Sequence, residues 1–264
     1  MNTVFVVGNK FRDFAVNDGV VTIGELEDQL HARGPGHLPP NVRLVPGQGL
    51  READMQRLRA RLRGAQSASR VPDVEGRPVR ASRLLTHKYR LQNSIVSAPR
   101  RLSDDLFEAA LLLDERSELM SDHQTGQHIQ GMVLVEAARQ MFLAVSEEYF
   151  IGYDDPTRYY FVINSMNAAF SAFVFPVDAT LRYEILEKRV DNRARMFFRV
   201  NVDVMQAGRC ATRVGYEFTA FHAERIEVKE REQAIAVLAS VREGRQGAHA
   251  QVLVQDRQET GTQS

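Results

Sequence analysis

The chain has 264 residues, enough for one large domain or two small ones, and its 34 Lys and Arg residues balance 34 Asp and Glu residues. This balance gives no support for binding nucleic acid or a membrane surface through net charge, and the single cysteine, Cys210, excludes an intrachain disulfide and a cysteine-cluster metal site. Because the sequence has neither a run of roughly 20 apolar residues nor the basic start of a signal peptide, we expect a cytoplasmic protein.

The first 66 residues form one region by their pattern. They contain two strand patterns, each followed by a helix pattern: residues 3–11, 22–30, 41–50 and 51–64. Thr22 is placed as the N-cap of the first helix, and Glu25 is placed three residues later as its capping-box partner. The region therefore predicts a small βαβα unit at residues 1–66.

A polar segment with two prolines, residues 67–83, predicts a linker. It lies within a longer stretch, residues 51–101, that is rich in arginine and poor in acidic residues. Two interpretations of this stretch remain open. It is either a solvated helix face followed by a linker, or a docking patch for an acidic partner or a phosphate.

From residue 84 onward, strand patterns surround one long helix pattern at residues 128–150. That helix is apolar on nearly every side, which indicates that a curved sheet wraps it. Strands are expected at residues 93–102, 105–115, 158–176, 179–190 and 195–225, the last range being two strands joined by a turn at Gly208. This pattern predicts an α+β fold over residues 84–228. A short helix at residues 231–241 and a disordered tail are expected to follow within residues 229–264.

The long helix carries the first candidate site residue. Gly131 lies in its first turn, where backbone amides have no partner within the helix and point outward at the positive end of the helix dipole. The missing side chain could let a substrate carbonyl approach those amides, as in an oxyanion hole. Alternatively, it only permits close packing of the helix against the sheet, and the sequence leaves both interpretations open.

Glu136 follows one and a half turns later among apolar residues, where an unpaired carboxylate is costly. Arg139 and Gln140 come three and four residues further on, within reach of that carboxylate. Burial would raise the pKa of Glu136, whereas Arg139 would lower it. The sequence therefore leaves open a buried ion pair, a general base, or a carboxylate that orients a nucleophile.

Histidines form the remaining candidates. His123, which Asp122 could orient, and His128 lie just ahead of the helix in "DHQTGQH". No further His, Cys or carboxylate follows at a suitable spacing, so no metal site is predicted. In "THK", Lys88 beside His87 could hold a phosphate or a phosphopantetheine arm, or both residues could face solvent at a strand end.

The segments "THK" at 86–88 and "DHQTGQHIQGMVLVEAARQ" at 122–140 resemble the A-factor biosynthesis (AfsA) hotdog family, over roughly residues 84–225. The resemblance implies a hotdog fold, in which a strongly bent antiparallel sheet wraps one central helix, usually as a dimer. Typical members have two hotdog repeats in one chain, whereas this chain has one. We therefore expect a homodimer with two sites at its interface.

A wider resemblance is to bacterial 3-hydroxyacyl-carrier-protein dehydratases, which share the spacing of Gly131 and Glu136. In those enzymes the glutamate is catalytic, and a histidine ahead of the helix is its partner. Counting back from Glu136, the histidine position falls on Asp122, one residue before His123. Arg139 also departs from the small residue typical of dehydratases, so the residues match the AfsA pattern better.

The AfsA resemblance implies an enzyme of γ-butyrolactone-type signal synthesis. It would transfer a β-ketoacyl group from acyl carrier protein or coenzyme A to the hydroxyl of an acceptor such as dihydroxyacetone phosphate. The thioester carbonyl would lie near Gly131, Glu136 or His123 would accept the hydroxyl proton, and Arg139 or Lys88 would steady the phosphate. No cofactor is expected. The alternatives are a 3-hydroxyacyl-thioester dehydratase or thioesterase, and a non-catalytic acyl-binding module.

Aromatic residues leave a further choice open. Five phenylalanines suit an apolar acyl tunnel but also an ordinary core: Phe142, Phe161, Phe170, Phe173 and Phe175. Cys210 lies inside a predicted strand and is expected to be inert packing.

Overall fold

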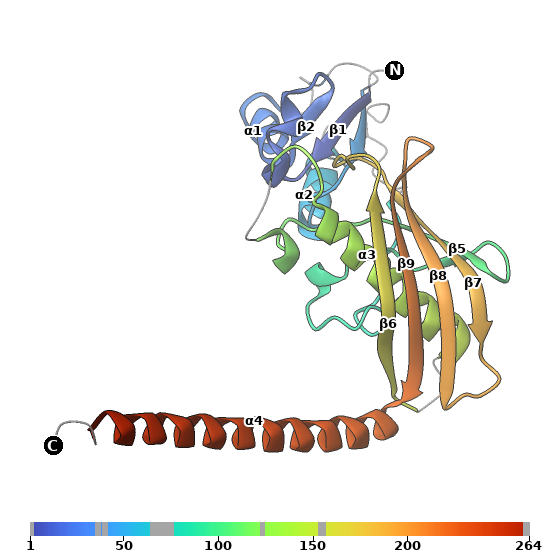
Figure 1. Ribbon diagram of the computed structural model, residues 1–264. Coiled ribbons are helices and arrows are strands. Elements are labelled where there is room, and N and C mark those ends of the chain that lie inside the picture. Colours follow the sequence, from blue (N-terminus) through green and yellow to red (C-terminus); the bar gives the residue numbers. More distant parts are fainter. Residues whose placement is uncertain are drawn as a thin grey trace.

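The computed structural model describes residues 3–34, 38, 42–63, 77–121, 125–152 and 157–260, with side chains only as far as Glu243. The chain folds into a small three-stranded sheet and a larger six-stranded sheet (Figure 1). The N-terminal unit lies at one end of the long strands, and the C-terminal helix leaves from the opposite end. Among the described residues, no helix is both long and apolar enough to cross a membrane.

The N-terminal unit is a parallel sheet with two helices. Its elements are β1 (Thr3–Val7), β2 (Val20–Thr22), α1 (Ile23–Arg33), β3 (Arg43–Pro46) and α2 (Glu52–Arg63), with strand order β2-β1-β3. The predicted capping box is confirmed, because Glu25 N donates to Thr22 Oγ1 (3.2 Å) and Thr22 N donates to Glu25 Oε2 (3.0 Å). The predicted βαβα order missed β2, whose three residues are too few for a periodic signal.

The larger unit is an antiparallel sheet packed on one central helix, α3 (Gly131–Ser146). Its strands are β4 (Arg100–Arg101), β5 (Leu106–Ala110), β6 (Tyr159–Phe170), β7 (Thr180–Arg189), β8 (Arg195–Gln206) and β9 (Arg209–His222), in the order β4-β5-β7-β8-β9-β6. Twelve of the sixteen α3 residues are buried, and Phe142 stacks on Phe218 with ring centroids 4.3 Å apart. The hotdog prediction is confirmed.

The central helix begins and ends differently from the prediction. It starts at Gly131, with Gln130 as its N-cap, so His128 stays in the preceding turn. After Ser146 the backbone widens into a π-helical turn over Glu147–Ile151. The predicted hairpin turn is confirmed, because Ala207 and Gly208 have φ of 49° and 74°, as a two-residue turn of this kind requires.

Two predicted boundaries are corrected. The linker prediction extended to residue 83, but Ala81 is fully buried in the large core and Arg80 pairs with Ser97 in an isolated β-bridge; residues 64–76 lie outside the described part. The short helix and disordered tail predicted near the C-terminus are one helix, α4 (Ala223–Thr260). No proline interrupts that segment, so helix-forming residues extend it.

The two units are joined through β1 and the turn after β3. Val6 packs in the small core, whereas its neighbour Val7 packs in the large one, because successive strand residues face opposite sides. The buried side chain of Gln48 donates to Leu111 O (2.9 Å) and accepts from Leu113 N (2.8 Å). The N-terminal unit is therefore an integral part of the molecule.

Candidate functional site

A charged cluster surrounds the carboxylate of Glu136. Arg139 donates through Nε to Oε2 (2.7 Å) and through Nη2 to Oε1 (2.9 Å). Lys88 Nζ lies 2.6 Å from Oε1. The structure thus brings together residues of the two family-like segments, "THK" and "EAARQ", on a single carboxylate.

Gln140 fixes this cluster to the fold. Its amide Nε2 donates to Glu136 Oε1 (2.9 Å) and to Asn93 O (2.8 Å), and its Oε1 accepts from Ile95 N (2.8 Å). The side chain is fully buried. Because every polar atom of this amide has a partner, Gln140 holds Glu136 in one orientation.

Electrostatics settle the ionisation of Glu136. Burial alone would raise the pKa of this carboxyl, but the hydrogen bonds from Arg139 and Lys88 outweigh burial, and the pKa lies below its ordinary value. The same contact raises the pKa of Arg139. The three side chains are 15%, 30% and 22% exposed for Glu136, Arg139 and Lys88. The cluster therefore holds two cations against one carboxylate, and solvent can reach it.

His87 lies beside Lys88 but points elsewhere. Its Nε2 is 2.7 Å from Oε1 of Glu147 in the π-helical turn, and its ring meets Phe161 edge-on at 5.3 Å. The backbone of His87 is left-handed, with φ of 52°, which directs the two neighbouring side chains to different partners. Both residues line a cavity of about 720 Å³ that also touches the start of α4, including Glu227.

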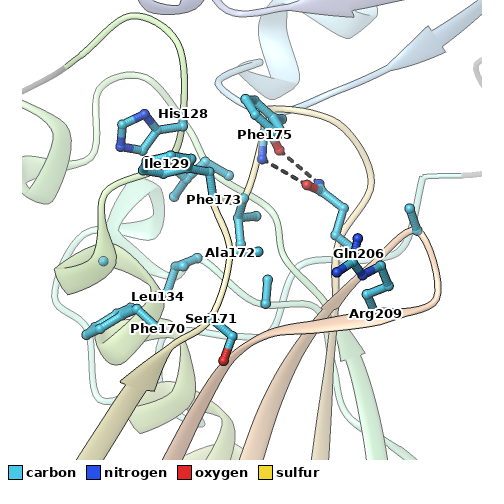
Figure 2. Close-up of a pocket in the computed structure, with 14 residues that line it drawn as sticks. His128, Ile129, Leu134, Phe170, Ser171, Ala172, Phe173, Phe175, Gln206 and Arg209 are labelled. Atoms are coloured by element: carbon cyan, nitrogen blue, oxygen red, sulfur yellow. Dashed lines mark hydrogen bonds between the residues drawn. The ribbon is translucent and has the colours of Figure 1, made fainter.

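An apolar pocket of about 770 Å³ lies at the N-terminus of α3 (Figure 2). The lining residues come from the α3 start, the loop after β6 and the β8–β9 turn: Gly131, Leu134, His128, Ile129, Phe170, Phe173, Phe175, Gln206 and Arg209 among others. Three of the five candidate tunnel phenylalanines therefore border a pocket. Phe142 is fully buried in the core, and Phe161 packs against that core.

Both interpretations of Gly131 find support. A Cβ at this position would lie 2.8 Å from Cε1 of Phe170, so glycine permits close packing of that ring. Within the described residues, the amides of Gly131 and Met132 donate to no acceptor, whereas Val133 N already donates to Gln130 O (3.1 Å). Two amides without an acceptor in the described part of the chain thus lie at a helix N-terminus that borders an apolar pocket.

The structure separates the predicted site residues into two groups. Gly131 and His128 border the pocket, whereas Glu136 and Arg139 do not line it. At about 100° per residue, Glu136 lies about 140° around α3 from Gly131. Within one chain, the carboxylate therefore does not face the free amides.

The histidine-bearing loop is described in part. His128 Nδ1 is 3.3 Å from Thr125 Oγ1, and its ring packs on Phe173 with centroids 4.5 Å apart. Asp122 and His123 lie outside the described residues. Among the residues that are described, no group of three or more His, Cys, Asp and Glu side chains could hold a metal ion.

Sequence reasoning missed two residues that shape these sites. Glu147 holds His87, and Gln206 holds the backbone of Phe175 on the pocket rim through Phe175 N (2.9 Å) and Phe175 O (3.0 Å). Neither residue has a local signal, because both act on partners distant in the sequence. Cys210 is half-buried, and burial raises the pKa of its thiol, as expected for an inert cysteine.

Several described arginines of the stretch 51–101 have acidic or carbonyl partners within the fold. Arg57 pairs with Glu27 and Asp54, and Arg100 pairs with Glu108. Arg80 is largely buried and donates to backbone carbonyl groups. These contacts favour a structural role for the stretch.

Solved structures that resemble this chain include thioesterases. A mutant thioesterase from Pseudomonas aeruginosa matches with a TM-score of 0.35 and 14% identity, over 48% of this chain and 81% of that chain. A thioesterase from Haemophilus influenzae matches with a TM-score of 0.33 and 16% identity, over 47% and 77%. A protein of unknown function from Pseudomonas aeruginosa, described as a probable thioesterase, matches with a TM-score of 0.37 and 11% identity, over 53% and 92%.

A comparison with curated proteins finds no match. The family model of the A-factor biosynthesis hotdog domain matches residues 70–222, which is more than half of the chain. The match contains the whole Glu136 cluster and the N-terminus of α3. This chain belongs to the A-factor biosynthesis hotdog domain family.

Proposed function

We propose that this chain transfers a β-ketoacyl group from an acyl carrier protein, or from coenzyme A, to the hydroxyl of a small phosphorylated acceptor such as dihydroxyacetone phosphate. Family membership supports an enzyme that processes acyl thioesters. The observation that carries the transfer proposal is the Lys88–Glu136–Arg139 cluster. Its two cations face one carboxylate, so the cluster has a net charge of one positive unit. An accessible positive cluster suits a phosphate ester.

The reaction needs one bond exchange. The acceptor hydroxyl oxygen attacks the thioester carbonyl carbon, the carbon–oxygen ester bond forms, and the carbon–sulfur bond breaks. The hydroxyl proton passes to a base and then to the departing thiolate. The free amides of Gly131 and Met132 would stabilise the oxyanion, and the apolar pocket beside them would hold the acyl chain.

Glu136 has a role in binding within this scheme. Its low pKa makes it a weak base, and its contacts place Lys88 and Arg139 for a phosphate. His123 stays the candidate base, as a prediction. No cofactor is needed beyond the phosphopantetheine arm or coenzyme A that carries the acyl group.

We also propose a homodimer paired along β6. This edge strand has twelve residues, none of them charged, although free strand edges commonly carry charges that prevent pairing. Three apolar side chains along it are exposed by 40 to 53%: Ile163, Met166 and Phe170. Identical strands that pair antiparallel about their middle suit a two-fold axis.

Such pairing would unite the two groups of site residues. In an antiparallel pair of identical strands, the Phe170 end of one strand lies opposite the Phe161 end of the other. Phe170 packs on Gly131 beside the pocket, whereas Phe161 contacts His87, the neighbour of Lys88. The pocket of one protomer would then border the charged cluster of its partner.

Intact-mass spectrometry of a β-ketoacyl carrier protein tests the proposed transfer. Unloading that needs dihydroxyacetone phosphate supports it, and Lys88→Met should reduce this unloading while the exposed control Arg100→Met leaves it unchanged. Unloading without an acceptor would indicate a thioesterase, and loss of one water from a 3-hydroxyacyl carrier protein would indicate a dehydratase. Binding without any turnover would indicate an acyl-binding module.

A further inference from the structure

The apolar pocket has two distinct ends. Phe170 lies at one end, next to the first turn of α3, and Phe175 lies at the other end, nearest the N-terminal unit (Figure 2). An acyl chain whose carbonyl group lies at the free amides of Gly131 would therefore extend toward Phe175. The Phe175 end is where the pocket can limit chain length.

The N-terminal unit packs behind Phe175 at this distal end. Phe14, in the 3₁₀ turn Phe14–Val16, stacks on Phe175 with ring centroids 5.6 Å apart and planes 22° apart. Phe14 N also donates to Gly126 O (3.1 Å), and Gln127 Nε2 donates to Asp13 O (2.7 Å). The N-terminal unit thus holds both the ring at the distal end and the loop that leads to His128.

Little freedom remains for the backbone around Phe175. Gln206 accepts from Phe175 N and donates to Phe175 O, and Pro176 O accepts from Gln48 N (2.9 Å). With its backbone held on both sides, Phe175 can move only its ring. The position of that ring depends on Phe14 behind it.

We propose that the N-terminal unit is the distal wall of the acyl pocket, and that the Phe14–Phe175 pair sets the longest acyl chain it accepts. This inference rests on the proposed function only in taking the pocket as the acyl site. Each methylene buried in an apolar pocket improves affinity by about fourfold. Affinity should therefore rise with chain length until the chain reaches Phe175, and then stop rising.

Titration calorimetry of the full chain with 3-oxoacyl pantetheine amides tests this, because an amide cannot be turned over readily as a thioester can. A series from about 4 to about 14 carbons measures the gain in affinity for each added methylene. The wild type should show a break at one length. Phe175→Ala and Phe14→Ala should both move the break to longer chains, by about two carbons or more, since each removes a ring from the wall.

Two further variants keep the test decisive. Phe14→Leu retains apolar volume and folding, and should move the break in the same direction by less. Phe173 lines the pocket and its ring packs on His128, whereas the ring of Phe14 packs on Phe175. Phe173→Ala should therefore weaken binding at every chain length without moving the break. A break that stays in place in both Phe14 variants would overturn the inference.

The outcome separates the inference from the proposed function. If acyl amides bind with a break that the Phe14 variants move, but carrier-protein unloading never needs an acceptor, the inference stands and acyl transfer fails. If the wild type binds no acyl amide of any length, the pocket is not an acyl site and the inference is overturned. Thermal unfolding of each variant confirms that the compared proteins are folded.

Discussion

Glu136 is ionised because three donors from two segments surround it, although it lies on an otherwise apolar helix. The desolvation that would favour its neutral form is offset by those contacts. In the scheme proposed above, the carboxylate is thus an anchor for Lys88 and Arg139. A general base near neutral pH would need a raised pKa, which this environment does not provide.

Replacement of Glu136 by Gln should destabilise the fold in a pH-dependent way. The pKa of Glu136 in the folded state lies below its reference value of 4.5. Its contribution to stability is therefore present above about pH 4.5 and is lost as the pH falls through the folded-state value. We expect Glu136→Gln to lower the free energy of unfolding by about 1–3 kcal/mol at neutral pH, and the difference to shrink in acid. Urea unfolding of both proteins across this range measures it, and a gap that widens in acid would contradict the assignment.

Gly131 can be tested for its two interpretations at once. Gly131→Ala places a Cβ against the Phe170 ring and should cost about 1–2 kcal/mol of stability if that ring cannot turn away. In the Phe170→Ala background the clash is gone, so adding Gly131→Ala should cost little further stability. If packing is the whole role of glycine, the added change should cost little activity as well. Persistent loss of activity in the folded double variant would indicate that the open approach to the amides matters.

At the scale of elements, β6 has an edge that is uncharged and largely exposed along its length. Met166→Arg should convert the proposed dimer to a monomer, because a buried unpaired cation opposes pairing. Leu186→Arg on β7, where the native side chain is 52% exposed, is the matched control. Light scattering coupled to size exclusion gives the masses. A wild-type monomer, or a Met166→Arg dimer, would exclude pairing along this edge.

Elements with local signals were predictable from the sequence. The capping box of Thr22 and Glu25 and the turn at Gly208 depend on neighbouring residues alone, and both are confirmed. β2 was missed because three residues carry no period, and its pairing with β1 is a tertiary effect. The burial of Ala81 was missed for a similar reason, since its polar surroundings in sequence read as a linker.

The sequence predicted which residues belong to the candidate site, but not how they are arranged in space. Glu136, Arg139 and Gln140 are neighbours on one helix face, so their contact follows from helix geometry. The approach of Lys88 to Glu136 depends on packing of distant segments, and only the family resemblance placed both in one motif. The separation of Glu136 from Gly131 around α3 follows from their five-residue spacing, but the pocket that makes it matter is a tertiary feature.

At the scale of the whole molecule, the N-terminal unit contributes side chains to the core of the larger unit. Val7 and Phe11 belong to the large core although they lie in the N-terminal unit, and Gln48 satisfies backbone groups of the large unit with its buried side chain. A contact surface that includes buried hydrogen bonds is lost as a whole, because partial opening would leave the bonded groups buried without partners. We therefore expect the units to unfold together.

The variant Leu26→Ala tests this coupling, with the near-ultraviolet tyrosine signal as the readout. Leu26 is 1% exposed in the small core, and its truncation should cost about 2–4 kcal/mol. All seven tyrosines follow residue 66, so the near-ultraviolet tyrosine signal reports only the larger unit. If the units unfold together, Leu26→Ala lowers the midpoint of the tyrosine transition, while Val16→Ala, at a 79% exposed position, leaves it unchanged. An unmoved tyrosine midpoint in Leu26→Ala, with a separate earlier loss of helical signal, would show that the N-terminal unit unfolds alone and can withdraw Phe14 from Phe175.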